Sequence, residues 1–425
     1  MITANRAARL PVATVASLVL AAGAIAVAEI DVARHSETLD AGEGWSIALV
    51  LALAGAAGVV SLADRHRVRL RSLVSVPWLF ALGGWLLVAA LVSADRTTSL
   101  AWTLAVWGLA TTAIRAQRVG GWTPVAATLG GAFALFMAAT GVAAVATDYD
   151  LWISDRLFGL SLDANQMARV AGVGVLAGAA LVRRAWRNGS PVAPLGIFGG
   201  LLVVGGLVAE YLTRSRTGWI ALALALLVAA LYRFDWRLVM LVAVAAVAVG
   251  VFVVPEVADQ PLEEIVSRNE AGADLSTVRG RTSTWQESID LARADPLFGV
   301  GPALDDEHFA EAWFDGRINW GARNAHSLWG HLLVIGGVPA LLLALGAGLA
   351  YVRNRPPHPG PFIDAVVAFL VLDGVTEAVV ITPNIAVFGL AAAMAAANPG
   401  LPASVDPLGE VGALGADGGR VAMTR

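Results

Sequence analysis

The chain has 425 residues, of which 57% are hydrophobic and only 15% are charged, and its mean hydropathy is +0.69. A soluble protein of this size carries about a quarter charged residues, so the composition predicts a polytopic membrane protein. There is no cysteine, and all 29 basic residues are arginine, which excludes disulfides, thiolate chemistry and lysine Schiff bases.

Apolar runs long enough to cross a bilayer recur along the chain. A hydrocarbon core about 30 Å thick needs about 20 apolar residues per helix. By this measure the sequence predicts an all-α polytopic membrane protein with about twelve transmembrane helices. They cover residues 10–30, 45–63, 73–93, 99–114, 122–147, 165–182, 192–212, 217–232, 238–254, 327–352, 362–381 and 384–398. The first run also resembles a secretory signal, but its length favours an uncleaved span.

Arginines divide the connectors between these spans into two alternating sets. Fifteen lie in one set: Arg6, Arg9, Arg65, Arg67, Arg69, Arg71, Arg115, Arg118, Arg183, Arg184, Arg187, Arg233, Arg237, Arg353 and Arg355. Five lie in the opposite short connectors: Arg34, Arg96, Arg156, Arg214 and Arg216. Because basic residues concentrate on the cytoplasmic side of a membrane protein, this bias places both termini in the cytoplasm.

One polar segment, residues 255–325, interrupts the apolar sequence with 14 acidic residues against six arginines. The predicted organisation is nine spans in 1–254, an extracytoplasmic loop with short helices at 255–325, and three spans in 326–398. A cytoplasmic, disordered tail follows at 399–425. Because loops on a rigid scaffold often carry reactive residues, we expect the chemistry where this loop meets the membrane.

The connector Thr213-Arg214-Ser215-Arg216-Thr217-Gly218 places two arginines on the side that should be poor in arginine. A guanidinium grips phosphate bidentately, and the N–H groups that open the next helix also favour an anion. This pattern predicts a phosphate-binding site. The alternative is that these arginines pair with lipid headgroups or with Glu210.

A second candidate, Arg281, precedes a predicted helix that Thr282 or Ser283 would cap and Asp295-Pro296 would end. The apolar face of that helix would comprise Trp285, Ile289 and Ala292, which predicts an amphipathic helix lying on the outer surface. A cation at a helix start is electrostatically unfavourable, so Arg281 indicates an anionic ligand. Alternatively, Arg281 balances the acidic residues of the loop.

A third candidate is His326, which lies where the tenth span begins. An imidazole at the water boundary can exchange protons near neutral pH, so it is a candidate general base. The alternative is a histidine that caps the helix. His331 is five residues further along, so the two side chains would point about 140° apart on one helix, which argues against a shared metal site.

Asn165 and Arg169 lie in the first turns of the sixth span. A charge within a span costs roughly 2.5–3.5 kcal/mol on insertion scales, so Arg169 should face the interior of the bundle. Asp373 and Glu377 share one face of the eleventh span, at i and i+4. These three residues therefore predict a structural ion pair.

Taken in this order, the motifs resemble the O-antigen ligase/polymerase family of bacterial envelope glycosyltransferases. The matching fragments are Asn165 with Ala168, Ser215-Arg216-Thr217-Gly218, Gly280-Arg281 before Trp285, Pro296-Leu297-Phe298-Gly299-Val300-Gly301, Ala325-His326-Ser327 and Gly336-Gly337-Val338-Pro339. They span roughly residues 160–345. Each fragment is short, but together they are fairly specific for that family.

The resemblance implies a cofactor-free, metal-independent transferase of the inner membrane, with its active site outside the cytoplasm. The donor would be a sugar on a polyprenyl diphosphate such as undecaprenyl diphosphate. The acceptor would be a hydroxyl of a lipid, polysaccharide or protein glycan, attacked with inversion. By the same resemblance, Arg216 and Arg281 would bind the diphosphate and His326 would be the general base. Arg214, Asn165 and Arg169 complete the expected substrate-binding residues.

Two other functions remain open from the sequence. One is a peptidoglycan polymerase-like enzyme, although the loop motifs of that family are not evident. The other is a transporter or flippase of lipid-linked sugars. Transporters place ionisable groups near mid-membrane, whereas the candidate charges here cluster at the outer edge of the spans. No nucleic acid is expected as a partner, and the residues do not distinguish a ligase from a polymerase.

Overall fold

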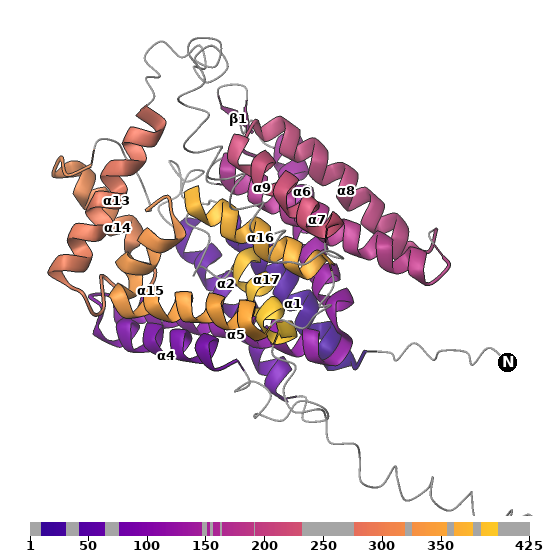
Figure 1. Cartoon of the computed structure of the whole chain (residues 1–425), viewed down its shortest axis with the longest axis horizontal. Coiled ribbons are helices and arrows are strands. Elements are labelled where there is room, and N and C mark those ends of the chain that lie inside the picture. The colour runs from indigo at the N-terminus through magenta and orange to yellow at the C-terminus, as the bar shows by residue number, and fades with distance from the viewer. Residues whose placement is uncertain are drawn as a thin grey trace, which may run out of the picture.

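The fold is known from a computed structural model that describes residues 10–30, 42–63, 76–146, 151–153, 156–161, 164–190, 192–231, 276–318, 325–354, 361–376 and 384–397. Within these residues, helices form nearly all of the regular structure (Figure 1). They are α1 (Val12–Ala28), α2 (Gly42–Ala63), α4 (Pro77–Val92), α5 (Arg96–Gly120), α6 (Trp122–Ala146), α7 (Ala164–Arg187), α8 (Pro194–Thr213), α9 (Arg216–Ala230), α13 (Ser276–Ala294), α14 (Asp305–Phe314), α15 (Leu328–Asn354), α16 (Pro361–Thr376) and α17 (Ile385–Ala397).

The prediction of a helical membrane protein is confirmed at this level. Eleven of the twelve predicted spans coincide with one of these helices, whereas span 238–254 lies outside the described residues. Four helices, α6, α7, α8 and α15, are both long and apolar enough to cross a bilayer, and shorter apolar helices accompany them. The sequence did not predict a two-stranded antiparallel hairpin, in which β1 (Trp152–Ile153) pairs with β2 (Arg156–Leu157).

Polar contacts show which helix ends meet. Glu29, which follows α1, accepts hydrogen bonds from Gln166 Nε2 of α7 at 2.9 Å and from the backbone N–H of Ile385 in α17 at 3.3 Å. The β1–β2 hairpin lies at this same end of α7, so we call it the hairpin end. Tyr351 and Asp364 join α15 to α16 elsewhere, through a 2.8 Å hydrogen bond. The bundle is therefore tied by buried polar contacts between distant parts of the chain.

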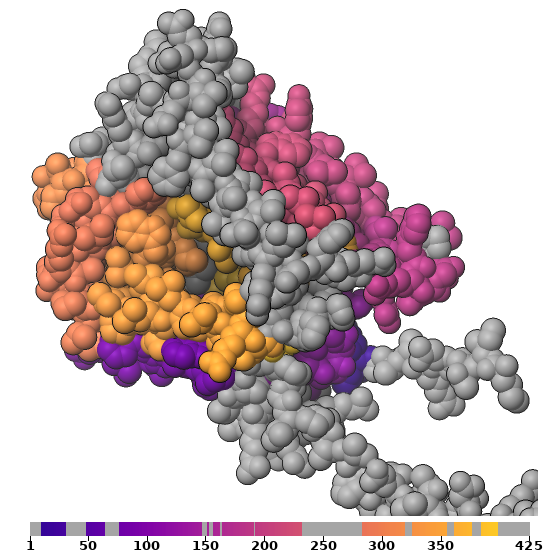
Figure 2. All heavy atoms as spheres, viewed as in Figure 1, coloured from indigo at the N-terminus to yellow at the C-terminus, as the bar shows by residue number. Residues whose placement is uncertain are grey.

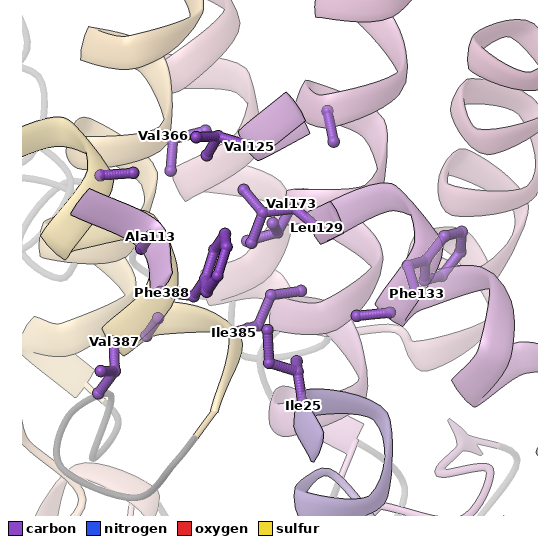
Figure 3. Close-up of a cluster of buried hydrophobic side chains, with 14 of the residues drawn as sticks. Ile25, Ala113, Val125, Leu129, Phe133, Val173, Val366, Ile385, Val387 and Phe388 are labelled. Carbon is purple, nitrogen blue, oxygen red and sulfur yellow. The ribbon is translucent and has the colours of Figure 1, made fainter. Parts of the chain in front are cut away.

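The main apolar core lies where α1, α5, α6, α7, α16 and α17 converge (Figure 3). Phe136, Phe369 and Phe388 are fully buried there. Packing between α7 and α8 depends on small residues, because a Cβ added to Gly178 would lie 2.6 Å from the Gly199 carbonyl oxygen. Small residues at such interfaces let membrane helices approach closely.

The helix that carries Arg281 differs from its prediction. It begins at Ser276 rather than at Thr282 or Ser283, so Arg281 lies inside α13 instead of at its start. The end after Ala294 agrees with the prediction. Thr284, Glu287 and Ser288 are among the buried residues of α13. Ala292, of the predicted apolar face, is also buried, so α13 packs against protein with both polar and apolar side chains.

Helix α15 is broken near its middle. Gly337 has φ 67° and ψ −169°, so the helix is interrupted between Gly336 and Val338. A left-handed φ of this kind suits glycine, which has no Cβ. Helix α15 contacts α13, α14 and α4, and also α16 and α17. Figure 2 shows a hollow in the surface between α15, in orange, and α16, in yellow.

Candidate active site

The arginine connector, residues 213–218, has a hydrogen-bonded backbone. Ser215 is the N-cap of α9, and its hydroxyl accepts from the Gly218 N–H at 3.2 Å. The Thr213 hydroxyl accepts from the Ser215 N–H at 3.2 Å and donates to the Glu210 carbonyl at 2.7 Å. Between these two residues, Arg214 has the left-handed φ of 51°. The sharp turn that carries both arginines is therefore held on each side.

Asn165 and Ala168, which form one motif in the sequence, both touch this connector. The Asn165 Oδ1 accepts from the Ser215 hydroxyl at 2.9 Å. A Cβ added to Gly218 would lie 2.7 Å from the Ala168 Cβ and 2.3 Å from Glu210 Oε1, so only glycine allows α9 to approach α7 this closely. Two motifs about 50 residues apart are thus one structural unit.

Arg216 is the first residue of α9, and its side chain is exposed. The first turn of α9 has no acidic residue. A cation at a helix N-terminus is unfavourable unless an anion neutralises it. Arg216, rather than Arg281, is therefore the candidate arginine that the structure places at the start of a helix.

Glu210 is fully buried below the connector. Neither of its carboxylate oxygens has a hydrogen-bond partner among the described residues. The structure therefore does not support the alternative in which the connector arginines are present to neutralise Glu210.

Arg169 forms the ion pair that the sequence predicted. Its Nε lies 2.6 Å from Asp373 Oδ2, and the two side chains are 6% and 0% exposed. The second predicted partner, Glu377, lies outside the described residues. Removing one partner from a buried ion pair is strongly destabilising, so Arg169 and Asp373 have a structural function between α7 and α16.

The second candidate region is the contact between α13 and the start of α15. Thr284 Oγ1 donates to the Ala325 carbonyl at 3.4 Å, and a Cβ on Gly330 would lie 3.2 Å from Ser288 Oγ. Thr284 and Ser288 lie at i and i+4, so they share one helical face of α13. This is the face that lies against Ala325, the residue directly before His326.

His326 is held in an unusual backbone conformation. Its φ is 44°, which non-glycine residues rarely adopt. Ser327, rather than His326, caps α15, because Ser327 Oγ accepts from the Gly330 N–H at 3.1 Å. His331 lies elsewhere, with its Nδ1 3.1 Å from Asp305 Oδ2 of α14. The alternative in which His326 is only a helix cap is therefore not supported.

Backbone strain coincides with the predicted site. Among the described residues, the non-glycine residues with positive φ are Arg214, His326 and Ala303. Left-handed conformations cost an L-residue roughly 1–2 kcal/mol and tend to persist at functional positions. Two of the three are residues that the sequence selected for chemistry.

Segment 296–301 fills the break in α15. The Val300 N–H donates to the Val334 carbonyl at 2.8 Å, and the Val338 N–H donates to the Pro296 carbonyl at 2.9 Å. Trp85 of α4 donates its indole N–H to the Gly336 carbonyl at 2.7 Å and stacks on Phe298 at 5.3 Å. The break in α15 is therefore filled by protein and does not line an open channel. Two further family-like motifs, residues 296–301 and 336–339, meet at this break.

Glu287 ties α13 to the segment around α14. Its carboxylate pairs with Arg317, and its Oε1 lies 3.0 Å from His308 Nε2. Burial lowers the pKa of His308 from its ordinary value, against the opposing effect of the Glu287 charge. Arg317, like burial, lowers this pKa. We refer to α13, α14 and the first half of α15 together as the histidine unit.

The two candidate regions lie in different parts of the molecule. In Figure 1, α13 and α14 are at the left, α8 is at the right, and β1 and α9 lie between them in the upper middle. α16 contacts both α9 and α15. The structure therefore brings the arginine connector together with Asn165, and the helix of Arg281 together with the start of α15. The side chain of Arg281 lies outside the described residues.

Fold and site together define a multi-pass membrane protein with polar, strained connectors at helix ends and a packed helical insert. Residues 201–345 match the family model described as O-antigen ligase. This segment is therefore similar to the O-antigen ligase family, as the motifs predicted, and that family suggests a glycosyltransferase-type ligase or polymerase. The match covers 145 of the 425 residues, including Arg214, Arg216, Arg281 and His326. No curated protein matches the chain.

Sequence reasoning missed two residues that lie before the matched segment. Arg156 of β2 bonds both to Asn165 and to the Thr213 carbonyl. Trp85 bonds the broken turn of α15. One available signal was that Arg156 is an arginine in a connector otherwise predicted to be poor in basic residues.

Proposed function

We propose that this chain is an inverting, metal-independent glycosyltransferase that moves a glycan from a polyprenyl diphosphate to an acceptor hydroxyl. The observation that carries the proposal is the pairing of the motifs in space. Fragments whose contacting residues are 50 and 41 positions apart in the chain touch one another and flank two strained positions, Arg214 and His326. A packing motif alone does not require strain at an arginine and a histidine.

In this proposal, Arg216 and Arg281 bind the diphosphate, with Arg214 as a secondary contact. The exposed guanidinium of Arg216 and the N-terminus of α9 both favour an anion at the same place. Fixed cations stabilise the charge that develops on a departing diphosphate, as a metal ion does in other transferases. Asn165 and Arg169 hold the surrounding helices, and both contribute to substrate binding by keeping the connector in place.

His326 acts as the general base. The acceptor oxygen attacks the anomeric carbon opposite the diphosphate, so the configuration inverts. The bond from that carbon to the diphosphate oxygen breaks, and the acceptor proton passes to the imidazole. General-base catalysis is worth about 10²- to 10⁴-fold. In the predicted orientation, the site faces the outside of the inner membrane, and apolar helices accommodate the polyprenyl chain.

Reconstitution with a synthetic polyprenyl-diphosphate oligosaccharide tests this function. We expect transfer in the presence of EDTA, and a loss of about 10²-fold or more in Arg216→Ala, Arg281→Ala and His326→Ala. Arg96→Ala is the matched control, because Arg96 is an exposed arginine at the start of another helix. Full transfer by the three site variants would contradict the proposal.

Two further readouts separate the alternatives. Movement of the labelled lipid across the bilayer without a new glycosidic bond would indicate a transporter. In a deletion strain, loss of glycan chain length would indicate a polymerase, whereas loss of glycan attachment would indicate a ligase.

A further inference from the structure

We infer that Arg156 is a positioning residue that fixes the arginine connector for donor binding; this inference rests on the proposed function. Arg156 lies in β2 of the hairpin, ahead of the matched segment 201–345. Its guanidinium bonds two separate elements. Nε donates to the Thr213 carbonyl at 2.9 Å, and Nη2 donates to Asn165 Oδ1 at 3.2 Å.

The first bond acts on the strained turn. Thr213 is the last residue of α8, and the carbonyls at a helix C-terminus lack partners within the helix. A cation there is also favoured by the helix dipole. The peptide that carries this carbonyl leads directly into Arg214, whose φ is 51°. Arg156 therefore restrains the peptide that would rotate if the strain at Arg214 relaxed.

The second bond acts on the start of α9. Asn165 Oδ1 accepts from both Arg156 Nη2 and the Ser215 hydroxyl, which uses its two lone pairs. The Ser215 hydroxyl has one proton, so its 3.2 Å contact with Thr217 Oγ1 must be a bond that it accepts, like the bond from Gly218 N–H. A directed chain of hydrogen bonds thus runs between the hairpin and the first turn of α9.

These two bonds explain why the residue is an arginine. The planar guanidinium presents several N–H donors in a fixed fork, so it can bond acceptors on α7 and α8 at once. A lysine ammonium keeps the charge but lacks this geometry. The inference therefore predicts that charge alone is not enough at this position.

The test compares Arg156→Lys and Arg156→Gln with Arg96→Gln, which removes the same charge from an exposed helix start. We expect KM for the lipid-diphosphate donor to rise about tenfold in both Arg156 variants, with a smaller change in kcat. Arg96→Gln should match the unchanged protein. The melting temperature in detergent shows whether a variant folds. If Arg156→Gln does not fold, the KM of Arg156→Lys, which conserves the charge, decides the test.

A double variant adds a second readout. Because Arg156 and Asn165 act through one network, Arg156→Gln combined with Asn165→Ala should raise KM little more than the larger single change. Unchanged KM in Arg156→Lys, an equal effect of Arg96→Gln, or additive effects in the double variant would overturn the inference. If one of these results occurs while Arg216→Ala abolishes transfer in the same assay, the inference fails and the proposed function stands. If Arg216→Ala transfers normally, the proposed function and the inference both fail.

Discussion

The arginine connector and the histidine unit are built from different interactions. Neutral hydrogen bonds hold the turn of the connector, where Ser215 bonds Asn165 and Gly218, and Arg156 adds a charged donor to Asn165. Ionisable groups hold the histidine unit, in which Glu287 pairs with Arg317 and lies beside His308. The first region should keep its geometry across the neutral pH range, whereas the second should respond to pH.

This difference suits the two functions that we propose. A diphosphate site needs cations whose geometry does not depend on pH, and arginine remains protonated throughout that range. A general base needs an imidazole near its ordinary pKa. A substitution in one region should therefore leave the structure of the other region intact, so that the function of the other region can still be measured.

The largest expected effect is on the filled break in α15, which anchors the histidine unit. In Gly337→Ala, the new Cβ would lie 2.3 Å from the Leu297 carbonyl oxygen, at a φ of 67°. Overpacking and strain together should cost roughly 2–4 kcal/mol of unfolding free energy. Thermal unfolding in detergent measures this cost. Gly348→Ala, in the same helix with open space around it, is the control and should not destabilise the protein.

The next effect concerns the charge that joins α13 to the α14 segment. Glu287→Gln keeps the shape of the side chain but removes the charge opposite Arg317 and His308. Because Arg317 is 40% exposed, solvent screens the pair, and we expect a loss of about 1–2 kcal/mol. Asp290→Asn, which breaks an exposed pair with Arg293, should change stability by about 0.5 kcal/mol or less. Equal losses in the two variants would contradict a special function for Glu287.

The pH dependence of stability gives a smaller effect with a defined sign. Burial lowers the pKa of His308 below its ordinary value of 6.5, so below pH 6.5 the unfolded chain binds this proton more readily than the folded chain. Stability from this group is therefore complete above pH 6.5 and falls as the pH decreases towards the lowered value. His308→Gln should flatten this fall in melting temperature between pH 7 and pH 5. Parallel curves for the two proteins would show that His308 does not contribute.

The smallest effect tests whether strain at the connector serves function. Arg214→Gly relieves the positive φ, and it should stabilise the protein by at most about 1 kcal/mol while weakening donor binding. Ala303→Gly relieves a similar φ of 67° outside the proposed site. It should raise the melting temperature without changing KM for the donor. A rise in donor KM for Ala303→Gly would contradict this assignment of strain.

Sequence alone predicted most of the helical architecture, because each apolar run corresponds to a physical requirement of the bilayer. It also selected Arg214 and His326, whose backbone strain only the structure shows. It misplaced the start of α13, because Ser276 and Thr282 are both acceptable cap residues in a polar segment and periodicity did not decide between them. It missed Arg156 and Trp85 because their importance depends on contacts with distant segments.

The central claim is that the arginine connector and the histidine unit serve one ligand site. The chain has no cysteine, so single-cysteine variants Thr217→Cys and Ser283→Cys report on each region without background. The rate of maleimide labelling of each cysteine is measured at increasing concentrations of polyprenyl diphosphate. The exposed Ser190→Cys is the control. The account predicts that both site cysteines are protected with the same half-saturating concentration, while Ser190→Cys labels unchanged. Protection of only one site cysteine, or of neither, would contradict it.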